Sequence, residues 1–223
     1  MQPTDRDGKT RLPVLLLLAL LLLVLLGIRH GWIPLPSRPP ALPQRTEEQE
    51  RLAAKVEELG GEVVFDADAP GQPVAEVLLR ATQVTDGDLT LLDEMPELKR
   101  LWLDDTKISD TGMPHLAGLV SLELLILSGT PITDRGLEHL KGLSQLTALA
   151  LDGTGVTDAG LAHLKDMTSL QLLSLEGTKV TDAGLEHLKG LTGLAVLELA
   201  GSQVTDQGVQ ALRKALRQTL IYH

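Results

Sequence analysis

The segment KVTDAGLEHLKGL, which runs from Lys179 to Leu191, decides the fold because related copies of it recur along the chain. An Asp that follows a Thr or a Ser stands at the same position in each copy. Successive members of this series are 24 residues apart: Asp86, Asp110, Asp134, Asp158, Asp182 and Asp206. A period of about 20–29 residues with Leu at fixed offsets indicates a solenoid, in which stacked repeats share one continuous core.

The residues before this segment predict a short strand and a turn in every repeat. Leu173 and Leu175 alternate with Leu172 and Ser174, so one pair should face the core and the other should lie on the opposite face. Gly177 should turn the chain. The next residue should occupy a buried corner, where its hydroxyl needs partners. We expect backbone partners in its own turn and in the next repeat for the column Thr82, Thr106, Thr130, Thr154, Thr178 and Ser202.

The opening segment itself predicts a short helix. We expect the Thr181 oxygen to cap the helix by accepting from the Gly184 N–H. Asp182 should sit in the first turn, where a negative charge is favourable, and Gly184 should allow close approach of another part of the chain. The core-facing side chains recur every three residues: Leu185, Leu188 and Leu191.

Both ends of the repeat array have the features of caps. Thr46 and Gln49 form a capping-box pattern, Gly60 is a plausible helix terminator, and the following EVVF favours a strand. At the other end, an amphipathic helix should precede a last edge strand, TLIYH. The expected organisation is an N-terminal cap at 46–73, repeats at 74–207 and a C-terminal cap at 208–223.

The chain begins with a basic tail, 1–11, followed by an uncharged apolar run at 12–28. Seventeen residues reach the short end of the range for a membrane span. A cleaved signal peptide is the alternative, but no small-x-small cleavage site follows the run. We therefore expect a transmembrane signal anchor, with a Pro-rich, extended linker at 29–45. The signal-like layout favours a single-pass membrane protein whose repeats are periplasmic or extracellular.

Composition excludes several classes of function. The absence of Cys rules out disulfides, thiolate metal sites and a Cys nucleophile. A net charge of −10 and 2% aromatic residues argue against nucleic-acid binding. A second periodic column holds the imidazoles of His115, His139, His163 and His187. Packed helices lie too far apart for these rings to converge on zinc, so no metal or other cofactor is expected.

The pattern LxxLxLxGTxVTDAGLxHLKGL resembles the leucine-rich-repeat family, in particular the short bacterial repeats of the ribonuclease-inhibitor-like type. It is also similar to the repeats of F-box leucine-rich proteins, although Thr replaces their Cys and no F-box lies upstream. The resemblance implies an α/β solenoid shaped as a horseshoe arc, with a parallel sheet on its concave side and short helices on its convex side. It also implies protein binding on the concave sheet without enzymatic activity.

The residues that vary between repeats are the candidates for binding. Outward-pointing strand positions form three columns, and the first two hold apolar residues that the repeat does not require. The candidate partner-binding residues are Leu78, Arg100, Trp102, Asp104, Leu124, Ile126, Asp152, Leu172 and Glu176.

The leading hypothesis is a membrane-anchored, non-catalytic module that binds a protein or peptide. No Ser/His/Asp, paired-acid or phosphate-loop arrangement falls outside the repeat template, so catalytic residues are not expected. A structural scaffold without a defined ligand is the alternative, because strand propensity alone favours Leu and Ile on a sheet. A ubiquitin-ligase adaptor has only the likeness to F-box repeats in its favour.

Overall fold

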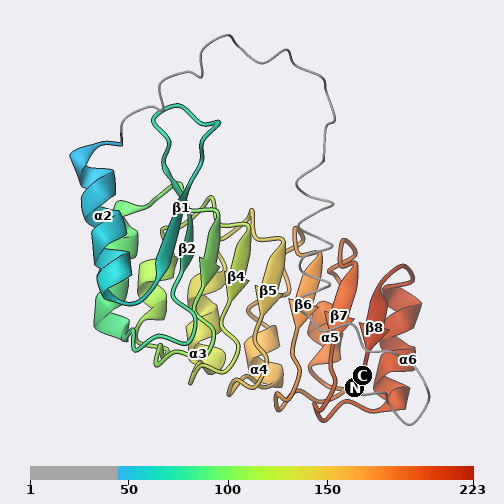
Figure 1. Cartoon of the computed structure of the whole chain (residues 1–223). Helices are drawn as coiled ribbons and strands as arrows, with labels where there is room; N and C mark the ends of the chain where they lie inside the picture. Colours follow the sequence, from blue (N-terminus) through green and yellow to red (C-terminus); the bar gives the residue numbers. More distant parts are fainter. Residues whose placement is uncertain (1–44) are drawn as a thin grey trace, which may run out of the picture. The chain divides into compact units, whose positions relative to one another are not determined.

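The computed structural model describes residues 45–223, which fall within one compact unit of the chain. Eight strands form one sheet in the order in which they occur in the sequence (Figure 1). Their bounds are β1 Glu62–Phe65, β2 Val74–Leu78, β3 Arg100–Trp102, β4 Leu124–Ile126, β5 Ala148–Ala150, β6 Leu172–Ser174, β7 Val196–Glu198 and β8 Leu220–Tyr222. The expected tail, membrane segment and linker up to residue 44 lie outside the described residues.

The strand register confirms the repeat. From β2 to β7 each strand pairs in parallel with the next, and the paired residues are 24 positions apart, as in Leu101 with Leu125. The cap strand β1 is different, because it pairs antiparallel with β2. The parallel sheet therefore begins at β2, and the last strand, β8, continues it as expected.

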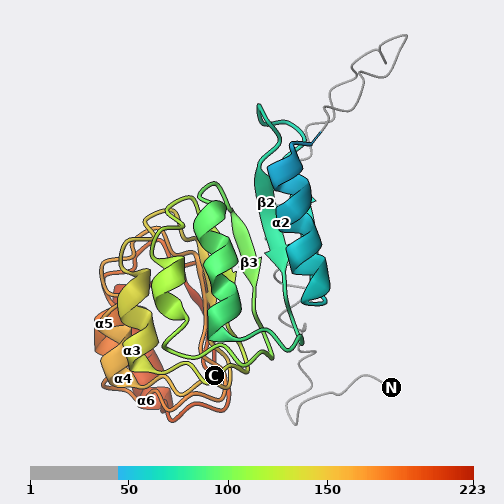
Figure 2. The ribbon, with the colours of Figure 1, turned by 90° about the vertical axis from the view of Figure 1, so that its left-hand side faces the viewer.

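The helical segments between the strands gather along one side of the sheet, whereas α2 precedes β1 and lies apart from them (Figure 2). Most are only one turn long, and several are 3-10 helices rather than α-helices. Their bounds are α2 Glu47–Glu58, η1 Asp86–Glu94, η2 Met113–Leu116, α3 Asp134–Leu137, η3 Glu138–Leu140, α4 Asp158–Leu161, α5 Leu185–Leu188 and α6 Asp206–Ala215. Such short helices cannot be stable alone, so they depend on packing against the sheet.

The core is a series of Leu columns between the sheet and the helices. The central strand residue of each repeat is fully buried, as are the helix residues that the three-residue spacing predicted. Leu185, Leu188 and Leu191, for example, are at most 2% exposed. Because each layer covers the apolar residues of its neighbours, no repeat could bury its own core alone.

A ladder of Asp carboxylates joins consecutive repeats on the helical side of the core. Asp158 accepts hydrogen bonds from the backbone N–H and the hydroxyl of Thr181, both at 2.7 Å. The same pair of bonds recurs at every step, and its members are Asp86 with Ser109, Asp110 with Thr133, Asp134 with Thr157, Asp158 with Thr181 and Asp182 with Thr205. We call these residues the aspartate ladder. The bonds from Thr205 hold the pKa of Asp182 below its usual value.

A Gly stands two positions after Asp110, Asp134, Asp158, Asp182 and Asp206, and it makes room for the carboxylate of the preceding repeat. A Cβ atom on Gly136 would lie 2.7 Å from Asp110 Oδ1, and one on Gly184 would collide with Asp158 Oδ1. The expectation that Gly184 permits a close approach is confirmed. The group that approaches is a side chain of the neighbouring repeat.

The ladder corrects the roles expected within the opening segment. Helix α5 begins only at Leu185, so Asp182 precedes it and does not lie in its first turn. The Thr181 hydroxyl donates to Asp158 and accepts from the Ala183 N–H, whereas the Gly184 N–H bonds to the Thr181 carbonyl. The pair Thr181–Asp182 therefore links repeats, a role that spacing within one repeat cannot reveal.

The buried Thr column also differs from expectation. Thr178 is 3% exposed, and its hydroxyl donates to the Leu175 carbonyl at 2.7 Å. Equivalent bonds within the same turn occur at Thr82, Thr106, Thr130 and Thr154. These hydroxyls close each turn locally and do not bond to the next repeat. Neighbouring repeats are linked near these turns by the aspartate ladder, by the sheet and by backbone bonds such as that from the Lys179 N–H to the Val156 carbonyl.

Several local features expected in the two caps are present. Thr46 and Gln49 make both bonds of the capping box, at 3.2 and 2.9 Å, and Gly60 adopts a φ of +83° just after α2. The residues of the C-terminal helix that were expected to face the core, Val209, Leu212 and Leu216, are at most 2% exposed. Asp206, the last member of the Asp series, has an 89% exposed side chain, and its only side-chain partner within residues 45–223 is His223.

We expect Asp158→Ala to destabilise the fold by about 2–4 kcal/mol, because two hydrogen bonds to a charged group are lost and their donors keep no partner. Asp206→Ala is the matched control, and the loss should stay below about 1 kcal/mol for an exposed ion pair. Urea unfolding of the full chain in mild detergent, followed by circular dichroism, measures both. Equal losses would contradict the ladder's role.

Candidate binding face

The strand face opposite the core brings the candidate binding residues into adjacent columns. The first column is Glu76, Arg100, Leu124, Ala148, Leu172 and Val196, and the second is Leu78, Trp102, Ile126, Ala150, Ser174 and Glu198. Residues that follow one another in a column are paired on neighbouring strands, which lie about 4.8 Å apart. The expected juxtaposition of Trp102 and Ile126 is therefore present.

Charges at the N-terminal end of this face are neutralised in pairs. Arg100 forms an ion pair with Glu76, and Arg80 forms one with Asp104 at 3.3 Å. The other carboxylate oxygen of Asp104, Oδ1, is buried without a hydrogen-bond partner. Trp102 lies next to these pairs and is half-buried. At this end, the Trp102 ring therefore lies beside ion pairs in which each Arg is neutralised by an acid.

The middle of the face is less accessible than the sequence suggested. Leu124, Ile126 and Leu172 are 7%, 6% and 0% exposed within the chain. The apolar patch predicted there is thus not an open surface, and a binding role for these three residues stays a prediction.

Exposed apolar side chains lie instead at the two ends of the face. Val64 on β1 is 44% exposed, and Leu220 and Tyr222 on β8 are 58% and 47% exposed. Leu220 pairs with Val196 and Tyr222 with Glu198, so β8 extends both columns by one residue. The repeat pattern does not identify Leu220 and Tyr222 as surface residues, because β8 lacks the repeat motif. The alternation in TLIYH, placed in register with β7, could have identified them.

The carboxyl groups of Asp152 and Glu198 both lie at the Ser174 hydroxyl, near the C-terminal end. The Ser174 hydroxyl is hydrogen-bonded to Asp152 and lies 3.3 Å from a carboxylate oxygen of Glu198. The Glu176 N–H donates to Asp152 Oδ1 at 2.9 Å. Within residues 45–223, no Lys, Arg or His forms an ion pair with Asp152 or Glu198. The charge pattern of this end therefore differs from that of the N-terminal end.

Burial raises the pKa of Glu198, which is only 4% exposed, and the nearby charges of Glu176 and Asp152 raise it further. The hydrogen bond from Ser174 acts in the opposite direction but is too weak to restore the usual pKa. The fold thus favours the neutral form of this carboxyl, and its charge costs stability at neutral pH.

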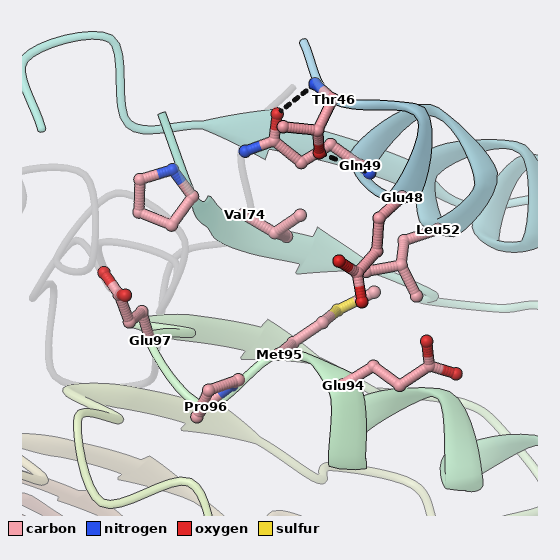
Figure 3. Close-up of a pocket in the computed structure, with 10 residues that line it drawn as sticks. Thr46, Glu48, Gln49, Leu52, Val74, Glu94, Met95, Pro96 and Glu97 are labelled. Carbon is pink, nitrogen blue, oxygen red and sulfur yellow. Dashed lines mark hydrogen bonds between the residues drawn. The ribbon is translucent and has the colours of Figure 1, made fainter. Parts of the chain in front are cut away.

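A separate hollow of about 200 Å³ lies where α2 meets the start of β2 and the end of η1 (Figure 3). Leu52, Val74 and Met95 line its apolar part, and Glu48 and Glu97 lie at its edge. The amide of Gln49 is occupied by the Gly71 and Gln72 carbonyls, at 2.6 and 2.7 Å. The hollow therefore belongs to the packing of the N-terminal cap.

The periodic His residues do not form a metal site in the described part of the chain. His115 lies 3.3 Å from a carboxylate oxygen of Asp93, which is an ordinary surface contact. No group of three or more His, Asp or Glu residues between 45 and 223 could hold a metal ion.

Within the same residues, no helix has the length and hydropathy of a membrane span. The predicted anchor at 12–28 lies outside this range.

The geometry agrees with that of solved repeat proteins. An internalin from Listeria monocytogenes superposes with a TM-score of 0.51 at 21% identity, covering 78% of this chain and 54% of its own. An internalin C2 from the same species gives 0.51 at 23% identity, covering 82% and 88%. This is a leucine-rich-repeat fold. The chain spans about half the length of the first of these internalins.

No protein-family model matches the sequence, and no curated protein matches it. At such low identity the two internalins establish the fold alone. The ribonuclease-inhibitor-like subtype stays a prediction from the repeat motif, and the function of this leucine-rich-repeat chain has to be argued from its strand face.

We expect Glu198→Gln to raise the unfolding temperature of the full chain at pH 8. The stability associated with the neutral carboxyl is fully present below its unfolded pKa of about 4.5 and is lost as the pH rises through the higher folded value. The gain should therefore shrink towards pH 4.5. Thermal unfolding measured between pH 4.5 and pH 8 tests this prediction, and the substitution Glu138→Gln at an exposed position is the control. A gain that does not depend on pH would contradict the assignment.

Proposed function

We propose that this chain is a membrane-anchored, non-catalytic module that binds a protein or peptide through its strand face. The observation that carries the proposal is the contrast between the two sides of the repeats. The core and ladder positions repeat nearly unchanged, whereas the strand face differs from repeat to repeat and places Trp102 beside Leu78 and Ile126. A side chain that the fold does not require is available for recognition, and Trp is frequent among residues that dominate binding energy.

The anchoring part of the proposal rests on the sequence before the described residues. An apolar run at 12–28 and a Pro-rich linker at 29–45 precede the repeats. A linker in the polyproline II conformation would extend by about 3.1 Å per residue and hold the repeats away from the bilayer. The repeats would then face the periplasm or the cell exterior.

Topology is tested by fusing alkaline phosphatase or β-galactosidase after Gln44. Alkaline phosphatase becomes active only outside the cytoplasm, so we expect activity from that fusion and none from the β-galactosidase fusion. The opposite pattern would place the repeats in the cytoplasm and reject this localisation. A fusion after Arg11, before the apolar run, serves as the matched control and should give the reverse result.

The binding face is tested by crosslinking the tagged full chain in native membranes. We expect Trp102→Glu to lower the yield of the crosslinked partner at least about tenfold, because a buried anchor would become charged. Val120→Glu is the matched control, since Val120 is 55% exposed and lies outside the strands. It should leave the yield unchanged.

Circular dichroism of both variants shows whether the fold is retained. If Trp102→Glu is folded and captures the same partner in the same yield, the strand face is not the binding site. A structural scaffold would then explain the chain better.

A further inference from the structure

The C-terminal end of the strand face combines exposed apolar groups with acids. Tyr222 pairs with Glu198 on the adjacent strand, and Leu220 pairs with Val196. Leu220 and Tyr222 are 58% and 47% exposed. A ligand can therefore reach Leu220 and Tyr222 directly, and the Glu198 carboxyl group, which is 4% exposed, lies on the strand next to Tyr222.

Charge is distributed unevenly along the face. The two Arg residues at the N-terminal end are each paired with an acid. At the C-terminal end, Asp152 and Glu198 have no cationic partner within residues 45–223, and both lie close to Ser174. Apart from the Ser174 hydroxyl, Glu198 has no hydrogen-bond partner for its side chain in this range. A desolvated carboxylate next to like charges is costly, and a cation placed beside it removes much of that cost.

We propose that the C-terminal patch, defined as Asp152, Glu198, Leu220 and Tyr222, binds a Lys or Arg side chain within an apolar segment of the partner peptide. This inference rests on the proposed function, because the patch belongs to the same strand face. The cationic group lies between the Tyr222 ring and the Glu198 carboxylate, while the methylene groups of its side chain contact Leu220.

Two physical arguments favour an organic cation over a metal ion. Calcium requires about 6–8 converging oxygen ligands, and no group of three metal-binding side chains exists among residues 45–223. An exposed Tyr ring, in contrast, attracts Lys or Arg through its negative face, and this attraction adds to an ion pair. The apolar surface of Leu220 can pack against the methylene groups of a Lys or Arg side chain.

The test uses the full chain in detergent micelles and a fluorescein-labelled peptide in which Leu and Arg alternate. The matched probe replaces Arg by citrulline, which has almost the same shape but no charge. We expect the Arg peptide to bind at least about tenfold more tightly by fluorescence anisotropy, which corresponds to about 1.4 kcal/mol. Equal binding of the two peptides, or no binding of either, would overturn the proposal.

Variants locate the binding on the chain. Glu198→Gln and Tyr222→Ala should each weaken the Arg peptide at least about fivefold, because each removes one of the two groups that contact the cation. Glu138→Gln is the control: it removes one negative charge from an exposed helical position and should leave the affinity unchanged. If Glu138→Gln weakens binding as much as Glu198→Gln, the peptide responds only to the net charge.

Weaker binding by Glu198→Gln cannot be attributed to unfolding, because this variant is expected to be more stable than the wild type at neutral pH. Sedimentation of the wild type and Tyr222→Ala tests a second copy of the chain as occupant. A dimer that Tyr222→Ala dissociates would overturn the proposal.

The cationic contact can fail while the proposed function holds. If Trp102→Glu abolishes capture of the native partner while Glu198→Gln does not affect it, the strand face binds the partner but the cationic contact is wrong.

Discussion

The hydrogen bonds that each carboxylate of the aspartate ladder accepts from the next repeat constrain the rest of the described structure. They place Thr181 against Asp158 at 2.7 Å, and each following Gly must lack a Cβ to admit the carboxylate. This contact holds one layer in register with the next, and the Leu columns then close the core. Because the contact is the same at every step, it leaves the strand face free to vary.

That freedom explains why binding is argued from the strands. A residue that recurs in every repeat cannot distinguish one partner from another. Trp102 at one end of the face, and Tyr222 with Glu198 at the other, occur once each and lie in different charge environments. The N-terminal end is balanced by ion pairs, whereas the C-terminal end gathers acids around Ser174. A partner that bound the whole face would have to match both ends.

The sequence could predict the features that follow from apolar periodicity and from local capping chemistry. The strand register, the buried Leu positions and the capping box at Thr46 follow from periodicity and local chemistry. It could not reveal that Asp158 and Thr181 bond to each other, because each residue alone also suits a helix start. Nor could it show that Leu172 would be buried, or that β8 would present Tyr222 beside Glu198.

The sequence by itself therefore determined the repeat, its length, the identity of the core positions and the two columns on the strand face. It did so because a 24-residue period brings the same residue types into contact in every layer. Only the tertiary structure decided which side chains of that face remain accessible and which charges lie close together. Accessibility and the pKa of Glu198 depend on all neighbours in space at once, and residues distant in the chain supply those neighbours.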